Sequence, residues 1–193
     1  YGCSNLQTIN LPDTITTIGK TCFFNCKKLN NIKLPSNLKI LNAQTFLGCT
    51  NLQNIELSQN LEALNGESLN GTSITKIKFP PNLSSIGNGA LSISTLQEIN
   101  TSENNYFEFK NGVLYSKDLK TLVMALPNVT SINIESTVET IQGYAFEYCN
   151  KLSNINITEK VKSIGKSAFS NSNLIGITVD PKNNYFTVEN NNL

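Results

Sequence analysis

Residues 26–48 read CKKLNNIKLPSNLKILNAQTFLG, and residues 49–71 read CTNLQNIELSQNLEALNGESLNG. The two segments have the same length and keep cysteine, leucine, isoleucine and leucine at matching positions. A fixed period of about 20 to 50 residues is typical of solenoid proteins, in which each repeat packs on the next. The pattern predicts about eight coils, at residues 3–25, 26–48, 49–71, 72–93, 94–102, 128–148, 149–171 and 172–180.

The composition of the 193-residue chain excludes several classes of function. Its 15 basic residues, all of them lysine, nearly balance 14 acidic residues, so a nucleic-acid partner is not expected. The sequence contains no histidine, the commonest general base and metal ligand, and no arginine, the bidentate partner of phosphate. No apolar run approaches the roughly 18 residues of a membrane-spanning helix, and no signal peptide opens the sequence. We therefore expect no membrane span, no cofactor and no metal site.

Each repeat opens with the segment L-x-x-I-x-L, whose final apolar residues are two positions apart. A period of two predicts a β-strand with one face buried. In the first repeat Ile9 and Leu11 are expected to point inward, and Pro12 to end the strand because proline lacks an N–H donor. The outward positions of the next four repeats form either a merely soluble face or a candidate ligand-binding face, made of Asn31, Lys33, Asn54, Glu56, Lys76, Lys78, Glu98 and Asn100.

The second half of each repeat contains another apolar pair, such as Ile15 and Ile18, which predicts a second short extended stretch. Glycine or asparagine follows at one position, and this alternation predicts a backbone with positive φ. The residues at this position are Gly19, Asn42, Asn65, Gly87 and Gly165. Gln142 departs from the rule, so that coil is expected to turn one residue later, at Gly143.

A small residue then precedes phenylalanine or leucine, as in Thr45-Phe46 and Ala145-Phe146. Stacked repeats would align these side chains in an aromatic spine. About six inward apolar side chains contribute roughly 10 to 20 kcal/mol to one coil, whereas ordering its backbone costs roughly 1 to 2 kcal/mol for each residue. A single coil is therefore unstable, and stability is expected to depend on neighbouring coils.

The repeat pattern fails over residues 103–127, which are predicted to be a β-hairpin insert. Asn111-Gly112 separates two runs of strand-forming residues, which is a strong hairpin signal. A third run, residues 120–125, is expected to pair with them. The insert replaces the second half of the fifth coil.

Two interpretations of the insert stay open. It covers the place where the solenoid wall is missing, or it presents an aromatic contact patch made of Tyr106, Phe107, Phe109 and Tyr115. The motif Asn-Asn-Tyr-Phe at residues 104–107 recurs at residues 183–186, so a second insert is expected from residue 181.

Four cysteines, Cys3, Cys26, Cys49 and Cys149, share one repeat position. Stacked repeats would place them in a ladder, and parallel Cα–Cβ directions disfavour a disulfide. Buried thiols are therefore favoured, because cysteine often behaves as a small buried apolar residue. A disulfide or a metal site is the alternative, although no histidine accompanies these residues.

The repeat resembles the leucine-rich repeats of the BspA-like group. Members carry the unit C-x-x-L-x-x-I-x-L-P-x-x-[LIV]-x-x-I-G-x-x-A-F and an interrupting hairpin similar to GVLYSKDLKTLV, and the resemblance covers essentially the whole chain. It implies a curved, β-rich leucine-rich-repeat solenoid with a parallel strand face, interrupted by the hairpin. Departures from the unit occur at Ser58, Thr101 and Gln142.

Proteins similar to this group are surface-exposed or secreted, and some bind extracellular-matrix proteins or mediate cell adhesion. The resemblance implies a non-enzymatic binding module within a longer protein at the cell surface or outside the cell. It also implies a matrix protein, a cell-surface protein or a glycan as the partner. The location rests on the resemblance, since the sequence itself shows no leader or anchor.

Two other classes of function remain as alternatives to an adhesive surface module. An intracellular protein-interaction scaffold would use the same solenoid, and a leader peptide in the precursor would argue against it. A parallel β-helix that cleaves polysaccharides would need clustered carboxylates. The sequence has only three aspartates, Asp13, Asp118 and Asp180, and its eleven glutamates show no closely spaced acidic pair, so an enzyme is not expected.

Overall fold

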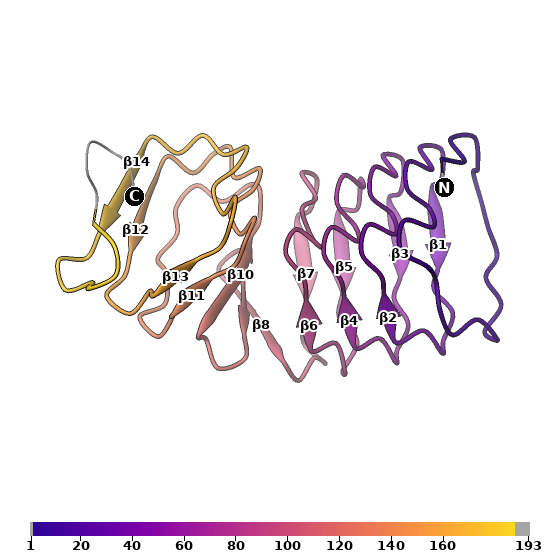
Figure 1. Cartoon of the computed structure of the whole chain (residues 1–193), viewed down its shortest axis with the longest axis horizontal. Coiled ribbons are helices and arrows are strands. Elements are labelled where there is room, and N and C mark those ends of the chain that lie inside the picture. The colour runs from indigo at the N-terminus through magenta and orange to yellow at the C-terminus, as the bar shows by residue number, and fades with distance from the viewer. Residues whose placement is uncertain (1, 188–193) are drawn as a thin grey trace. The chain divides into compact units, whose positions relative to one another are not determined.

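The computed structural model describes residues 2–187 and shows a parallel β-solenoid of about seven turns, close to the number of coils expected. The leucine-rich-repeat solenoid predicted from the sequence is thereby confirmed. No helix occurs among the described residues, so none of them belongs to a helix that could cross a membrane (Figure 1). The chain divides into two compact units, the first unit (Tyr1–Phe107) and the second unit (Glu108–Leu193).

The first unit contains two columns of short strands. One column contains β1 (Asn31–Lys33), β3 (Asn54–Glu56), β5 (Lys76–Lys78) and β7 (Glu98–Asn100), and the other contains β2 (Ile40–Leu41), β4 (Ala63–Leu64) and β6 (Ser85–Ile86). In the first column β1 pairs with β3 and β5 with β7, while β2, β4 and β6 form one sheet; all these pairs are parallel. Ile32 lies opposite Ile55, which is the equivalent residue of the next repeat. The strands are therefore paired so that equivalent positions of successive repeats lie side by side.

The core of the first unit is built from the apolar repeat positions. In β1, Ile32 is buried while Asn31 and Lys33 are exposed, as the period of two predicts. The rings of Phe23 and Phe46 stack with their centroids 5.2 Å apart, which confirms the expected spine at these two coils. Because each ring covers the next, the apolar surface of one coil is removed from water by its neighbours.

The first repeat differs from the expectation. Residues 3–25 form no strand, and Ile9 and Leu11 are half-buried instead of buried. Hydrogen bonds still connect it to the second repeat, such as those from the Asn30 N–H to the Gln7 carbonyl (3.3 Å) and from the Ser36 N–H to Asp13 Oδ1 (2.7 Å). Among the described residues β1 pairs with β3 and with no strand of the first repeat, so Ile9 and Leu11 lack the ladder that holds the equivalent side chains of later coils.

The second unit contains the hairpin insert and the later repeats. Its strands are β8 (Phe107–Lys110, which begins on the last residue of the first unit), β9 (Val113–Ser116), β10 (Thr121–Ala125), β11 (Thr140–Ile141), β12 (Asn154–Ile157), β13 (Ser163–Ile164) and β14 (Gly176–Val179). β12 pairs with β14, and the others form one sheet in the order β13, β11, β10, β9, β8. The rings of Phe146 and Phe169 stack with centroids 5.3 Å apart, so the spine is present here too.

The insert joins the solenoid through β10. This strand is antiparallel to β9 and parallel to β11, with Leu122 opposite Ile141. The pairing with β9 is the one expected for residues 120–125. The pairing with β11, which was not expected, places β10 where the second strand of a regular repeat would stand. The second insert expected from residue 181 is described only as far as residue 187, and residues 188–193 lie outside the described residues.

The prediction of positive φ at the glycine and asparagine position is wrong. Positive φ occurs two residues later in each coil, at Thr21 (58°), Gln44 (58°), Glu67 (56°), Gly89 (68°), Tyr144 (63°) and Ser167 (59°). Tyr144 keeps the same offset from Gln142 as in the other coils, so the later turn expected at Gly143 is also wrong.

Close approach of neighbouring coils explains the glycine and asparagine position instead. A Cβ on Gly87 would lie 2.6 Å from the backbone nitrogen of Gly66, closer than non-bonded atoms allow. At the same position of an earlier coil, the Asn42 side chain donates a hydrogen bond of 2.8 Å to the Ile18 carbonyl. At Gly87 the position takes glycine because backbone presses on backbone, and at Asn42 it takes asparagine because the amide bridges two coils.

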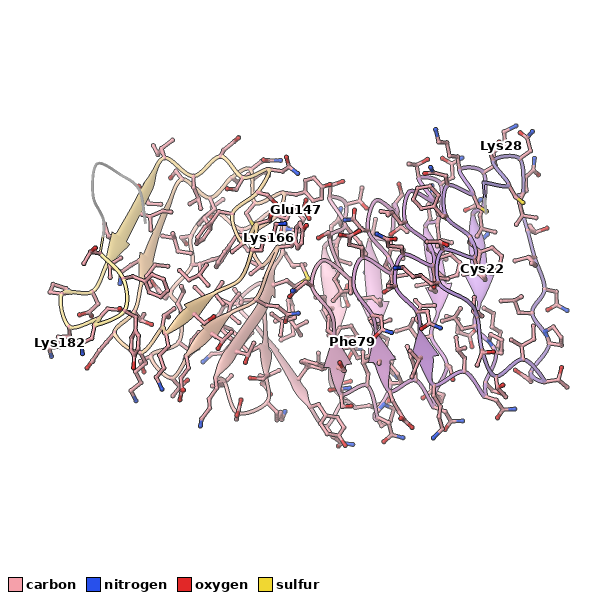
Figure 2. The ribbon with its side chains drawn as sticks, in the orientation of Figure 1. Cys22, Lys28, Phe79, Glu147, Lys166 and Lys182 are labelled. Carbon is pink, nitrogen blue, oxygen red and sulfur yellow. The ribbon has the colours of Figure 1, made fainter. Side chains whose placement is uncertain are left out.

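The cysteine ladder is only partly buried. Cys26, Cys49 and Cys149 have no exposed surface, as predicted, whereas Cys3 is exposed because it lies in the first repeat. Cys22 is also exposed (labelled in Figure 2). Burial raises the pKa of the Cys49 and Cys149 thiols to about 12, so both are protonated at neutral pH and do not act as nucleophiles.

Candidate ligand-binding face

The outward positions of β1, β3, β5 and β7 are all exposed. We call these residues the strand face: Asn31, Lys33, Asn54, Glu56, Lys76, Lys78, Glu98 and Asn100. The isoleucine between each outward pair is buried in β1, β5 and β7 and half-buried in β3. Alternation along the strand thus holds the polar side chains on one side of a packed apolar layer.

Side chains of the strand face bond to one another from coil to coil. The Asn54 Nδ2 donates to Asn31 Oδ1 at 2.8 Å. Lys33 Nζ lies 3.4 Å from Glu56 Oε1, and Lys76 Nζ lies 2.9 Å from Glu98 Oε2. The hydrogen bond that the Lys76 ammonium donates to the Glu98 carboxylate raises the pKa of Lys76, so the charged pair persists at neutral pH.

The third lysine of the strand face pairs outside it. Lys78 Nζ donates to Glu103 Oε1 at 2.7 Å. Each of the three lysines therefore has a carboxylate partner, and the strand face carries little net charge. Exposed ion pairs of this kind are worth about 0 to 1 kcal/mol, so a partner can replace them at small cost.

The shape of the strand face is shallow. An open hollow of about 330 Å³ lies over β1 and β3, and its floor includes Ile9, Ile32 and Ile55. No group of three or more metal-ligating side chains occurs among residues 2–187. The strand face therefore presents rows of amide and charged side chains above a floor that includes isoleucine side chains. Such a surface suits contact with an extended partner surface.

The four hairpin aromatic residues do not form one exposed patch. Tyr115 and Phe107 are 2% and 6% exposed, and Phe109 is half-buried, so of the four only Tyr106 is well exposed, at 47%. Phe107 packs edge-to-face on Phe79, labelled in Figure 2, with ring centroids 5.9 Å apart. The expected patch is corrected accordingly: two of its members are core residues, because Phe107 packs on Phe79 and because β9 is buried at three consecutive residues that include Tyr115.

Sequence reasoning missed a pocket beside the hairpin. It has a volume of about 240 Å³ and is lined by Lys110, Asn111, Val113, Tyr115, Ser131, Ile132, Asn133 and Glu135. Ser131 and Asn133 occupy the outward strand positions of the repeat and are exposed, but no sequence signal placed the hairpin against them.

Comparisons with known proteins agree with this architecture. The BspA type leucine-rich repeat region matches residues 1–120 and 122–191, with six copies. A leucine-rich cell surface protein from Faecalibacterium prausnitzii is similar in structure, with 27% identity and a TM-score of 0.82 over 91% of this chain and 48% of that protein. Comparison with curated proteins gives no match.

Two further solved structures share the fold alone. The pneumococcal vaccine antigen PcpA has 23% identity and a TM-score of 0.73, over 80% of this chain and 40% of that protein. A leucine-rich repeat protein from Bacteroides ovatus has 24% identity and a TM-score of 0.66, over 94% of this chain and 45% of that one. This chain spans less than half the length of each of these three solved proteins. Because the family pattern covers nearly all of the sequence and the solenoid matches, the chain belongs to the BspA-type leucine-rich repeat family.

Proposed function

We propose that this chain is a non-enzymatic binding module of a surface or secreted protein, and that it mediates adhesion to a host or matrix protein or to other cells. The observation that supports this most is the strand face, where eight polar side chains stand exposed on a frame of buried apolar residues. A preorganised surface of this kind loses little conformational entropy when it binds.

The surface location is supported by what the similar solved proteins are. One is described as a cell surface protein and another as a vaccine antigen. Repeat modules of this family serve as protein-binding scaffolds, which favours a binding role over catalysis. In this chain the high pKa of the buried Cys49 and Cys149 thiols also favours a binding role over catalysis, because a protonated thiol is a poor nucleophile.

Binding by the strand face is proposed to be weak for each module and strong in arrays. The lysines are already paired with glutamates. The free energy that a negatively charged partner gains is therefore only the difference between the exposed ion pair it forms and the one it displaces. The strand face also lacks tryptophan, tyrosine and arginine, the residues that dominate tight interfaces. Adhesion then depends on many modules engaging one extended partner at once.

The test measures binding of the purified chain to immobilised fibronectin, fibrinogen, laminin and collagen by surface plasmon resonance. The triple change Lys33→Ser, Lys76→Ser and Lys78→Ser should weaken binding to an acidic partner, and added salt should weaken binding by the original chain.

A matched control variant removes the same number of positive charges at positions outside the strand face. Lys39, Lys120 and Lys162 are also exposed and also pair with a glutamate of a neighbouring coil. Their triple change to serine should leave binding unaltered. Equal loss of binding in both triple variants, or in neither, would remove the strand face from the proposal.

A further inference from the structure

The pocket of the second unit is built by two segments that the repeat pattern alone would not bring together. The hairpin insert contributes four of its lining residues, and residues 131–135 of the next repeat contribute the other four. The end of the insert folds back on its turn, where the Leu126 N–H donates to the Gly112 carbonyl at 2.8 Å, and an ion pair between Lys110 and Glu135 joins the insert to the next repeat. A Cβ on Gly112 would lie 2.7 Å from Val129 Cγ1, so glycine permits this close packing.

The pocket has an apolar floor and a polar rim. Val113 and Tyr115 are each 2% exposed and close the floor together with the half-buried Ile132. Asn111, Ser131 and Asn133 lie exposed at the rim. Within residues 2–187 the side chains of these three make no hydrogen bond, so their amide and hydroxyl groups are available to a ligand.

One ion pair crosses the pocket. Lys110 Nζ lies 2.8 Å from Glu135 Oε1, and the two side chains are 46% and 29% exposed. The pair brings a donor and an acceptor to the pocket with no net charge. A ligand that carried a full charge of either sign would have to compete with the opposite charge already bound there, which disfavours ions.

Charge, size and chemistry together point to one class of ligand. Drug-sized ligands occupy pockets of about 300 to 1,000 Å³, whereas this pocket of about 240 Å³ holds one small unit. The accessible lining is mostly polar, and it both donates and accepts hydrogen bonds, as the hydroxyl groups of a polyol do. We propose that the pocket binds one neutral sugar unit of a glycan, independently of adhesion through the strand face.

The test uses the isotope-labelled whole chain and NMR titration with four probes: methyl α-mannoside, methyl β-galactoside, methyl β-glucoside and methyl β-N-acetylglucosaminide. At least one probe should shift the amide signals of residues 110–115 and 131–135. The double change Ser131→Ala and Asn133→Ala should weaken that binding about tenfold or more, since each lost hydrogen bond is worth about 1 kcal/mol.

A matched control lies one coil further along. Asn154 and Asn156 occupy the same repeat positions as Ser131 and Asn133 and are also exposed, but they are not in the pocket. Their double change to alanine should leave the titration unaltered. Binding of none of the four glycosides overturns the proposal, as does equal binding by the pocket variant. Free glutamate or lysine binding in the pocket where no glycoside binds would also overturn it.

Discussion

Asn104 and Asn183, 79 residues apart in the sequence, make the same four hydrogen bonds. The Asn104 Nδ2 donates to the carbonyls of Pro80 and Leu83, and its Oδ1 accepts the N–H groups of Tyr106 and Phe107. Asn183 makes the equivalent bonds to Thr158, Val161, Tyr185 and Phe186. Both side chains are buried, so the recurring Asn-Asn-Tyr-Phe motif is a structural clamp between one coil and the insert that follows.

The clamp predicts a large difference between neighbouring asparagines. Asn183→Ala should lower the free energy of unfolding by about 2 to 4 kcal/mol, because it leaves buried carbonyl and N–H groups without partners. Asn184→Ala, at the exposed next position, should change it by less than about 0.5 kcal/mol. Urea unfolding followed by circular dichroism measures both. Equal stability of the two variants would show that the clamp does not support the fold.

Burial alternates sharply in β2, where Leu41 has no exposed surface and Ile40 is 45% exposed. Leu41→Asp should destabilise the chain by more than about 4 kcal/mol, because it places a charge among stacked coils. Ile40→Asp should cost about 1 kcal/mol or less. Thermal melting compares the two variants, and the stacking account fails if the Leu41 variant melts at the temperature of the original chain.

The glycine position predicts opposite results in two coils. Gly87→Ala should destabilise by about 1 to 3 kcal/mol, since its Cβ would press on the backbone of Gly66. Gly19→Ala occupies the same repeat position with nothing within 4 Å of the added Cβ and should be neutral or stabilising by up to about 1 kcal/mol. Chemical denaturation tests both, and a similar loss in both variants would contradict the close-approach explanation.

Thiol accessibility separates the five cysteines. In the native protein Cys3 and Cys22 should react with a maleimide within the mixing time, whereas Cys26, Cys49 and Cys149 should stay protected until the solenoid opens. Mass spectrometry before and after denaturation counts the labels, which should rise from two to five. Cys49→Ser should remove one label from the denatured protein and none from the native protein. Labelling of native Cys49 as fast as Cys22 would refute its burial.

The raised pKa of the buried thiols makes stability depend on alkaline pH. Cys49 and Cys149 have a pKa of about 12 in the fold, against 9.0 for an unperturbed thiol. The protonated thiol is favoured in the fold, so its contribution is fully present below pH 9 and is lost as the pH rises towards 12. Each such thiol removes up to about 1.4 kcal/mol for each pH unit in this window.

Melting temperatures recorded from pH 7 to pH 11 measure this effect. Tyr115 adds to the slope above pH 10, because burial raises its pKa from 10.0 to about 12. Cys149→Ala should flatten the decline, since one of the titrating groups is gone. A melting temperature that is constant across this range would contradict the burial of these groups.

The aromatic side chains of the insert show where the sequence period fails to predict which residues are buried. The period of two within β1 correctly separated Ile32 from its exposed neighbours, because a strand has only two faces. In the insert no repeat existed to establish a register, so Phe107 and Tyr115 looked available for contact although both pack in the core.

The sequence by itself determined the period, the stacked solenoid and the exposure of the strand face. It could do so because side chains one repeat apart must meet in neighbouring coils, and local alternation then decides which of them face water. Only the tertiary structure decided the location of the positive φ residues, the reason for glycine at Gly87 and the pocket beside the hairpin. Those features depend on how closely separate coils and the insert approach one another, which no single repeat encodes.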